Sequence, residues 1–182
     1  VTDGGPRPII GNGVTARSHW GAIDNGTLTL EGNGTLHTVA EWNIGEAAAG
    51  TINMSGDSRW TNDSHLRLGM SFDGTLNLSG NAVYEAGPGA AIGVSAWADS
   101  ENTGRGYVSI ADNAKFRAMG WQFAIKGNHS NPLFNTPKSE VNITGNGRLV
   151  VPGDHTAKMN GYIADGLLTG SGLTAVYDAT NQ

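Results

Sequence analysis

The sequence predicts an all-β fold, a single-stranded right-handed parallel β-helix of about five coils with a short C-terminal capping helix. Three observations predict it: an eleven-residue segment recurs five times, apolar and polar residues alternate within each copy, and turn-forming residues follow each alternation. The copies span residues 26–36, 50–60, 74–84, 106–116 and 139–149, and the first three begin 24 residues apart. Such a period is typical of a solenoid, and connections between parallel strands are almost always right-handed.

Each copy starts with a predicted β-strand. Its apolar residues occupy every second position, which is the pattern of a strand with one face in a core. These pairs are Leu28 and Leu30, Ile52 and Met54, Leu76 and Leu78, Val108 and Ile110, and Val141 and Ile143. The residue between the members of each pair is Thr, Asn or Ser, so the outer face of the strand is expected to be polar.

A corner and two further strands complete each predicted coil. The corners are expected where Gly, Asn or Asp can adopt a positive φ, at Gly32–Asn33, Gly56–Asp57, Gly80–Asn81, Asp112–Asn113 and Gly145–Asn146. A large apolar residue follows each corner: Leu36, Trp60, Tyr84, Phe116 and Leu149. A third apolar pair then precedes Gly45, Gly69 and Gly93: Trp42 with Ile44, Leu66 with Leu68, and Ala90 with Ile92. These ladders predict that Trp42 and Trp60 lie in the core.

The chain is expected to form a single domain whose ends close the solenoid. In the N-terminal segment, Ile9 and Ile10 begin a partial coil, and Trp20 either caps the core or forms an exposed stacking platform. The domain divides into an irregular N-terminal segment, the coils and a C-terminal cap, at residues 1–25, 26–152 and 153–182.

The C-terminal cap is expected to contain a short helix. Asp154 is a suitable N-cap, Met159 contributes an apolar face, and Gly166 is a natural stop. A helix there would cover strand edges that otherwise offer unpaired backbone groups. Residues 173–177 are expected to form a final strand.

Composition bounds the possible partners. The net charge is −5, only 15% of residues are charged, and no basic run occurs, which argues against nucleic acid and anionic membranes as main partners. No apolar stretch is long enough to span a bilayer. The chain has no cysteine and begins at Val1, and we interpret it as a mature or excised piece of a larger secreted protein.

Two insertions interrupt the later coils, at residues 94–105 and 128–138. Both follow the third strand of their coils, so they are expected to leave the same corner and to lie side by side. Long loops on a rigid scaffold are frequent binding sites. A sugar ring packs its C–H bonds on an aromatic face, while its hydroxyls take hydrogen bonds from polar side chains. The predicted binding residues in and around the insertions are Trp97, Asp99, Glu101, Arg105, Trp121, Gln122, His129 and Phe134.

The repeat segment GTLNLSGNAVY and the tail GDHTAKMNGYIADGLLTGSGLTAVYDAT resemble the repeats of large secreted bacterial β-helix proteins. The size and the repeat style are also similar to those of a β-helical carbohydrate-binding module attached to xylanases. This second resemblance implies a module that recognises xylan and is fused to a catalytic domain.

Three functions are therefore weighed. The first is a non-catalytic, monomeric module that binds a plant cell-wall polysaccharide, xylan or a related β-glycan, without a cofactor. The second is a structural or adhesin solenoid that binds no small ligand. The third is a small polysaccharide lyase or glycosidase, in which Asp99 or Glu101 would face a second acid. No metal-ligand spacing occurs, although the acidic residues of the first insertion leave a calcium site open.

Overall fold

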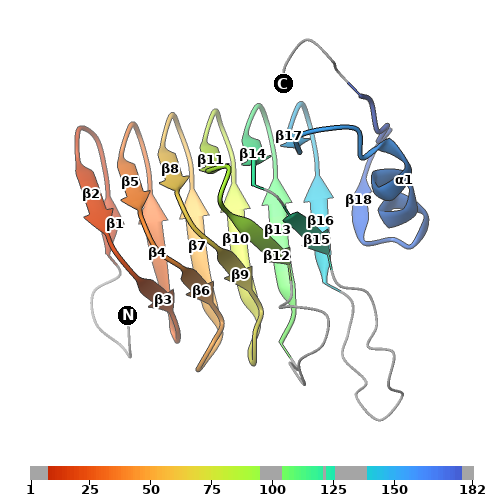
Figure 1. Cartoon of the computed structure of the whole chain (residues 1–182). Helices are drawn as coiled ribbons and strands as arrows, with labels where there is room; N and C mark the ends of the chain where they lie inside the picture. Colours follow the sequence, from red (N-terminus) through yellow and green to blue (C-terminus); the bar gives the residue numbers. More distant parts are fainter. Residues whose placement is uncertain (1–7, 95–103, 121, 126–138, 178–182) are drawn as a thin grey trace.

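The chain forms a parallel β-helix, in which it winds through three parallel sheets in turn (Figure 1). The computed structural model describes residues 8–94, 104–120, 122–125 and 139–177. Each of the first five coils contributes one strand to each sheet, and every pairing between described strands is parallel. The predicted all-β fold class is confirmed, while the right-handed sense of the coil stays a prediction.

The sheets differ in length. Sheet A has seven strands: β1 (Ile9–Ile10), β4 (Gly26–Leu30), β7 (Gly50–Met54), β10 (Gly74–Leu78), β13 (Gly106–Ile110), β16 (Glu140–Ile143) and β18 (Leu168–Gly170). Sheet B has six: β2 (Thr15–Ser18), β5 (Thr35–Thr38), β8 (Arg59–Asn62), β11 (Val83–Ala86), β14 (Lys115–Ala118) and β17 (Arg148–Val150). Sheet C has five: β3 (Gly21–Ile23), β6 (Trp42–Ile44), β9 (Leu66–Leu68), β12 (Ala91–Val94) and β15 (Gln122–Ile125).

The corners between sheets A and B use the predicted backbone conformation. Their first residues all adopt a positive φ between 58° and 66°: Gly32, Gly56, Gly80, Asp112 and Gly145. The residues that follow them form a ladder along the solenoid axis. Asn81 donates to Asp57 at 2.9 Å, Asn113 to Asn81 at 3.3 Å, and Asn146 to Asn113 at 3.1 Å. The side chain at each of these corners therefore forms a hydrogen bond with the equivalent side chain of the neighbouring coil.

Aromatic rings fill the core along the solenoid axis. The ring centroids of Trp42 and Trp60 lie 5.6 Å apart, those of Trp60 and Tyr84 4.9 Å, and those of Tyr84 and Phe116 4.7 Å. Phe123 continues the stack, 6.2 Å from Phe116. All five side chains are buried, which confirms the predicted core positions of Trp42 and Trp60.

Two polar residues are buried beside this stack. The Trp60 indole donates to Thr38 Oγ1 at 2.9 Å, and the Thr38 hydroxyl donates to Asn62 Oδ1 at 3.0 Å. Asn62 Nδ2 in turn donates to the Tyr84 hydroxyl oxygen at 3.3 Å. Burial raises the pKa of Tyr84 well above its ordinary value, because the phenolate would lose its hydration.

The prediction of an irregular N-terminal segment was wrong. Residues 9–23 form a complete coil, whose strands β1, β2 and β3 pair with β4, β5 and β6. Ile9 and Ile10 begin this coil, as predicted, but it lacks the Gly-Thr opening of the first three copies. Trp20 does not cap the core, because its side chain is 59% exposed. Trp42 fills that space instead: a Cβ on Gly21 would lie 2.6 Å from the Trp42 ring.

The predicted register of β12, which follows β11 in its coil, was also wrong. Ile92, rather than Ala90, lies opposite Leu66. The cause is the longer path from sheet B to sheet C: Ile92 follows Ala86 by six positions, whereas the equivalent Leu66 follows Asn62 by four. Gly93 consequently lies within β12, and buried Val94 ends the strand rather than opening the insertion.

The helix α1 (Thr156–Ala164) takes the place of a third strand in the last coil. Its residue Met159 is buried against the core, and Gly166 follows the helix with φ of 66°, as predicted. The N-cap position belongs to His155 rather than Asp154, whose carboxylate accepts the Thr156 N–H at 3.0 Å. The final strand is β18, and residues 173–177 form no strand, contrary to the prediction.

Candidate functional site

The two predicted insertions begin at neighbouring strand ends. Val94 at the end of β12 lies opposite Ile125 at the end of β15, and the strands that follow the insertions, β13 and β16, are also neighbours. The bases of the insertions thus lie side by side, as the repeat predicts. Most of the predicted binding residues lie outside the described residues, namely Trp97, Asp99, Glu101, Trp121, His129 and Phe134. Arg105 and Gln122 lie within them.

Arg105 is fixed at the base of the first insertion. Its backbone N–H donates to Asp73 Oδ1 at 3.1 Å, and its Nε lies 3.7 Å from the same oxygen. Its guanidinium carbon lies 5.4 Å from the centroid of the Tyr107 ring, within range of a cation–π contact. The guanidinium is 37% exposed, so it is held in place and still presents N–H donors to solvent.

Phe72 lies directly against this insertion base and is 48% exposed. Its carbonyl oxygen would lie 2.3 Å from a Cβ on Gly104, so only glycine fits beside it. We call Phe72, Asp73, Arg105 and Tyr107 the corner patch. It combines an exposed aromatic ring, a held cation and a half-buried phenol. Phe72 was not among the predicted binding residues, although a large aromatic residue within the turn Ser71–Gly74 indicates an exposed ring.

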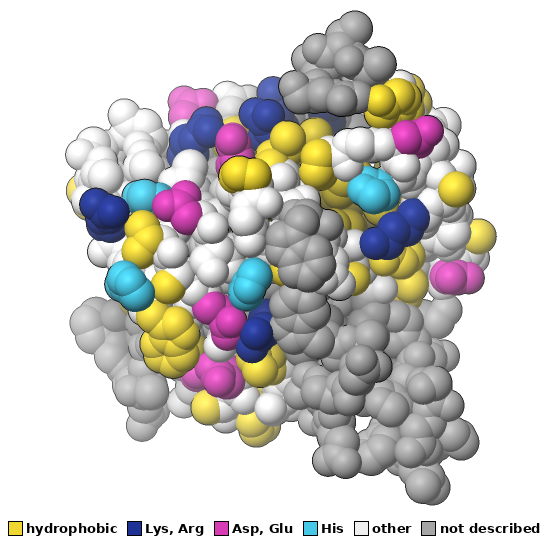
Figure 2. Space-filling view, in the orientation of Figure 1, with side chains coloured by type: hydrophobic (Ala, Val, Ile, Leu, Met, Phe, Trp, Pro, Cys, Tyr) yellow, Lys and Arg dark blue, Asp and Glu magenta, His cyan; other side chains and the backbone are white. Residues whose placement is uncertain are grey.

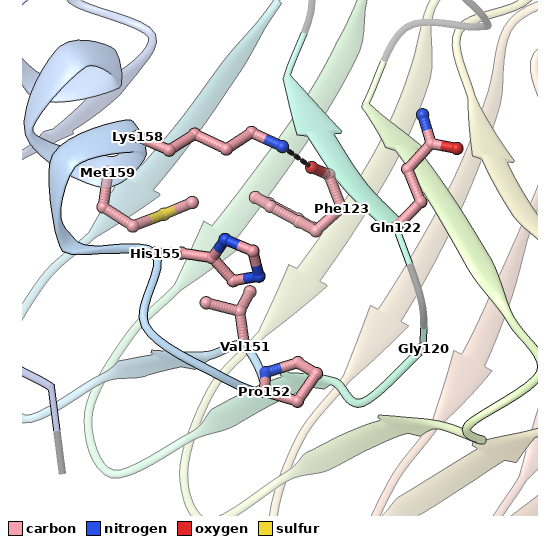
Figure 3. A pocket seen from close by; sticks show the side chains of 8 residues that line it. All are labelled: Gly120, Gln122, Phe123, Val151, Pro152, His155, Lys158 and Met159. Carbon is pink, nitrogen blue, oxygen red and sulfur yellow. Dashed lines mark hydrogen bonds between the residues drawn. The ribbon is translucent and has the colours of Figure 1, made fainter. Parts of the chain in front are cut away.

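Gln122 does not lie in the corner patch. It is the first residue of β15, opposite Ala91, and so belongs to the other end of the sheet C strands. It lines a cavity of about 70 Å³ together with residues of the C-terminal cap (Figure 3). Within that cavity Lys158 Nζ donates to the Phe123 carbonyl oxygen at 2.6 Å. The structure therefore separates Gln122 from Arg105 by the length of a strand.

The outer face of sheet C carries paired polar side chains. Arg67 and Glu41 form an ion pair at 2.9 Å, and Asn43 donates to Glu46 at 3.0 Å. Exposed Trp20 precedes β3 at the N-terminal edge of this face. Trp20 thus fits the alternative prediction of an exposed stacking platform rather than that of a cap.

His65 supports the lengthened connection into coil four. Its Nδ1 accepts the Ala91 N–H at 2.9 Å. The contact stabilises the corner where two extra residues shift the register.

The described residues contain no cluster of metal ligands and place no carboxylate in the two cavities. No group of three His, Asp, Glu or Cys side chains among them could hold a metal ion. The two cavities of about 70 Å³ and 750 Å³ have no Asp or Glu among their described lining residues. Within the same part of the chain, no helix is long and apolar enough to cross a membrane.

Comparison with known proteins gives no relative. No family model, no curated protein and no solved structure matches this chain.

Proposed function

We propose that the domain is a non-catalytic carbohydrate-binding module that binds a plant cell-wall polysaccharide, xylan or a related β-glycan, as part of a secreted bacterial glycoside hydrolase. The observation that carries the proposal is the corner patch, where exposed Phe72 abuts the base of an insertion and Arg105 is held beside it. An aromatic face for sugar C–H bonds and fixed donors for hydroxyls are the two elements of a sugar subsite.

The open geometry predicts modest affinity. Phe72 and Arg105 lie on an exposed corner rather than in a closed pocket, so a bound sugar would keep much of its contact with water. Stacking and a few exposed hydrogen bonds offset the entropic cost of binding only partly, which predicts dissociation constants of about 10 μM to 1 mM.

The test is retardation of the domain in native gels that contain xylan, β-glucan, mannan or pectin. Phe72→Ala, Arg105→Ala and Trp97→Ala are each expected to weaken retardation by about tenfold, the loss of one stacking or charged contact. Ile9→Ala and Arg17→Ala remove an exposed apolar and a basic side chain from the first coil and serve as matched controls. Equal retardation of all variants, or none by any glycan, would contradict the proposal.

A structural or adhesin solenoid is the second candidate, and one observation favours it. The side-chain ladder Asp57–Asn81–Asn113–Asn146 runs along the axis and ties successive coils together without presenting a ligand site. This function predicts that no polysaccharide retards the domain and that the exposed aromatic residues contact another protein.

A further inference from the structure

Two cations face each other on the outer side of sheet B. Lys115 of β14 and Arg148 of β17 are direct partners in the parallel register, so their Cα atoms are about 4.8 Å apart. Both side chains are exposed, and no carboxylate among the described residues forms an ion pair with either. Like charges at opposed positions of a sheet repel each other, so the fold gains nothing from this placement.

The cationic character extends over four neighbouring strands. The outward positions of β8, β11, β14 and β17 carry four cations, Arg59, Lys115, Arg117 and Arg148, and one carboxylate, Glu85. Glu85 contacts Arg59 at 2.7 Å and Arg117 at 3.5 Å, so it is shared. This surface therefore has a net charge of +3 on a protein with a net charge of −5. Figure 2 shows Lys and Arg side chains gathered along the upper side of the molecule, over sheet B.

Asp57 and Asp112 of the preceding turns form no ion pair with these cations. Asp57 Oδ1 accepts a hydrogen bond from Asn81, and Asp112 Oδ2 accepts the Gly80 N–H at 2.8 Å. Both are engaged within the ladder at the corner between sheets A and B.

A groove of about 750 Å³ opens beside the cations, where α1 stands in place of a sheet C strand. Lys115, Arg117 and Arg148 line it from sheet B. Its floor is apolar and includes Leu149 and Ile163. Tyr177, which is 44% exposed, lines the groove as well. The volume lies in the range of ligand sites, and an aromatic ring beside cations suits a sugar that bears a negative charge.

We infer that this groove binds carboxylated sugar units of an acidic polysaccharide. One carboxylate bridges Lys115 and Arg148, whose charges then no longer oppose each other, and the guanidinium can grip both of its oxygens. The sugar ring packs on the apolar floor and on Tyr177. The inference rests on the proposed polysaccharide binding, but the groove is separate from the corner patch and selects a charged rather than a neutral unit.

The test uses one polymer in two chemical forms, polygalacturonate and its fully methyl-esterified derivative, in native gels at low salt. The esterified form keeps the sugar chain and lacks the charge. We expect retardation by the acidic form only, and a loss of at least about tenfold in the double variant Lys115→Ala/Arg148→Ala. Arg17→Ala, a basic residue at the far end of sheet B, is the matched control. Circular dichroism verifies that each variant is folded.

The outcomes separate this inference from the proposed function. Loss of acidic-polymer binding in the double variant, with neutral-glycan binding intact, supports the inference. Acidic-polymer binding without any neutral-glycan binding also supports it, while contradicting the neutral ligand proposed for the corner patch. The inference is overturned if both polymer forms bind equally or not at all, or if the double variant binds like wild type. Equal retention on a DNA oligonucleotide or a sulfated polymer would also overturn it, because it would show a general polyanion surface.

Discussion

The early and late coils of the solenoid fill equivalent positions with residues of different chemistry. At the last position of the sheet B strands, the early coils bury Thr38 and Asn62, whereas the later coils bury Ala86 and Ala118. On the outer face of the same sheet, one row runs from Thr35 through Arg59 and Val83 to Lys115 and Arg148, and Arg59 is the cation of this row that pairs with a described carboxylate, Glu85.

This difference separates buried polar groups that bond one another from charged groups that are exposed to solvent. In the early coils, polar side chains point inward and satisfy one another through the Thr38–Asn62 network. In the later coils the charged side chains Lys115 and Arg148 point outward and have no carboxylate partner among the described residues. These exposed cations lie in the part of the chain where the regular period of 24 residues has already broken.

The largest expected effect comes from Trp60→Ala. Trp60 is fully buried between Trp42 and Tyr84, and its indole N–H is bonded to Thr38, so the free energy of unfolding is expected to fall by about 3–5 kcal/mol. Urea denaturation measures it. Phe116→Ala in the later coils removes a ring without a polar partner and is expected to cost about 1 kcal/mol less. A greater loss for Phe116→Ala would reverse the comparison.

Asn62→Ala is expected to lower the free energy of unfolding by about 2 kcal/mol, because it removes the amide that bonds Thr38 and Tyr84 and leaves buried polar groups unpaired. The neighbouring outward residue supplies a matched control, since Thr61→Ala is expected to change stability by less than about 0.5 kcal/mol. Equal losses in urea denaturation would show that the buried network contributes no more than surface contacts.

Alkaline pH is expected to weaken the fold through Tyr84, whose ring lies between those of Trp60 and Phe116. Its folded-state pKa is raised above the ordinary value of 10.0, so only the unfolded state releases the proton as pH rises past that value. Stability is therefore complete below about pH 10 and falls as pH rises further toward the folded-state pKa. Tyr84→Phe is expected to show a shallower fall in urea unfolding between about pH 9.5 and 11. Parallel curves for the two proteins would assign the fall to other groups.

The smallest effect is expected from Glu85→Gln. This side chain bridges exposed Arg59 and Arg117, so its loss is expected to cost less than about 1 kcal/mol, and less again at high salt. The same change raises the positive charge of the outer face and is expected to strengthen retardation by polygalacturonate. Glu31→Gln, at an exposed turn, is the control for a general charge effect. Weaker retardation of Glu85→Gln would count against an anionic ligand.

Much of the fold could be predicted from the sequence, because each coil packs on a copy of itself. The period-two pattern placed the strands at Leu28 and Leu30 and in every later copy, and the glycine corners adopt the expected positive φ. The first coil was predicted only in part, from Ile9 and Ile10, because Gly21 stands where other coils carry a large core residue. The register of Ile92 was missed because a longer connection moves a strand without changing its apolar pattern.

The candidate sites were harder to predict, because they depend on distances between coils. Arg105 was identified from its place next to an insertion, and the structure adds Phe72 and Tyr107 beside it. Gln122 is close to an insertion in sequence, yet it lies at the start of β15, whereas the insertion follows the end of that strand. The pair Lys115 and Arg148 is separated by 33 positions in the chain and meets only through the strand register.

The sheets of seven, six and five strands give the described solenoid unequal ends. In the first coil all three sheets have a strand. At the other end sheet C stops at β15, sheet B at β17 and sheet A at β18, and α1 occupies the position of a further sheet C strand. Lys158 and Tyr162 of the helix bond to backbone groups of Phe123 and Ile125, the strand edge that another chain would otherwise copy. Head-to-tail stacking into a filament needs a flat strand edge at both ends, and the described residues supply one only at the first coil.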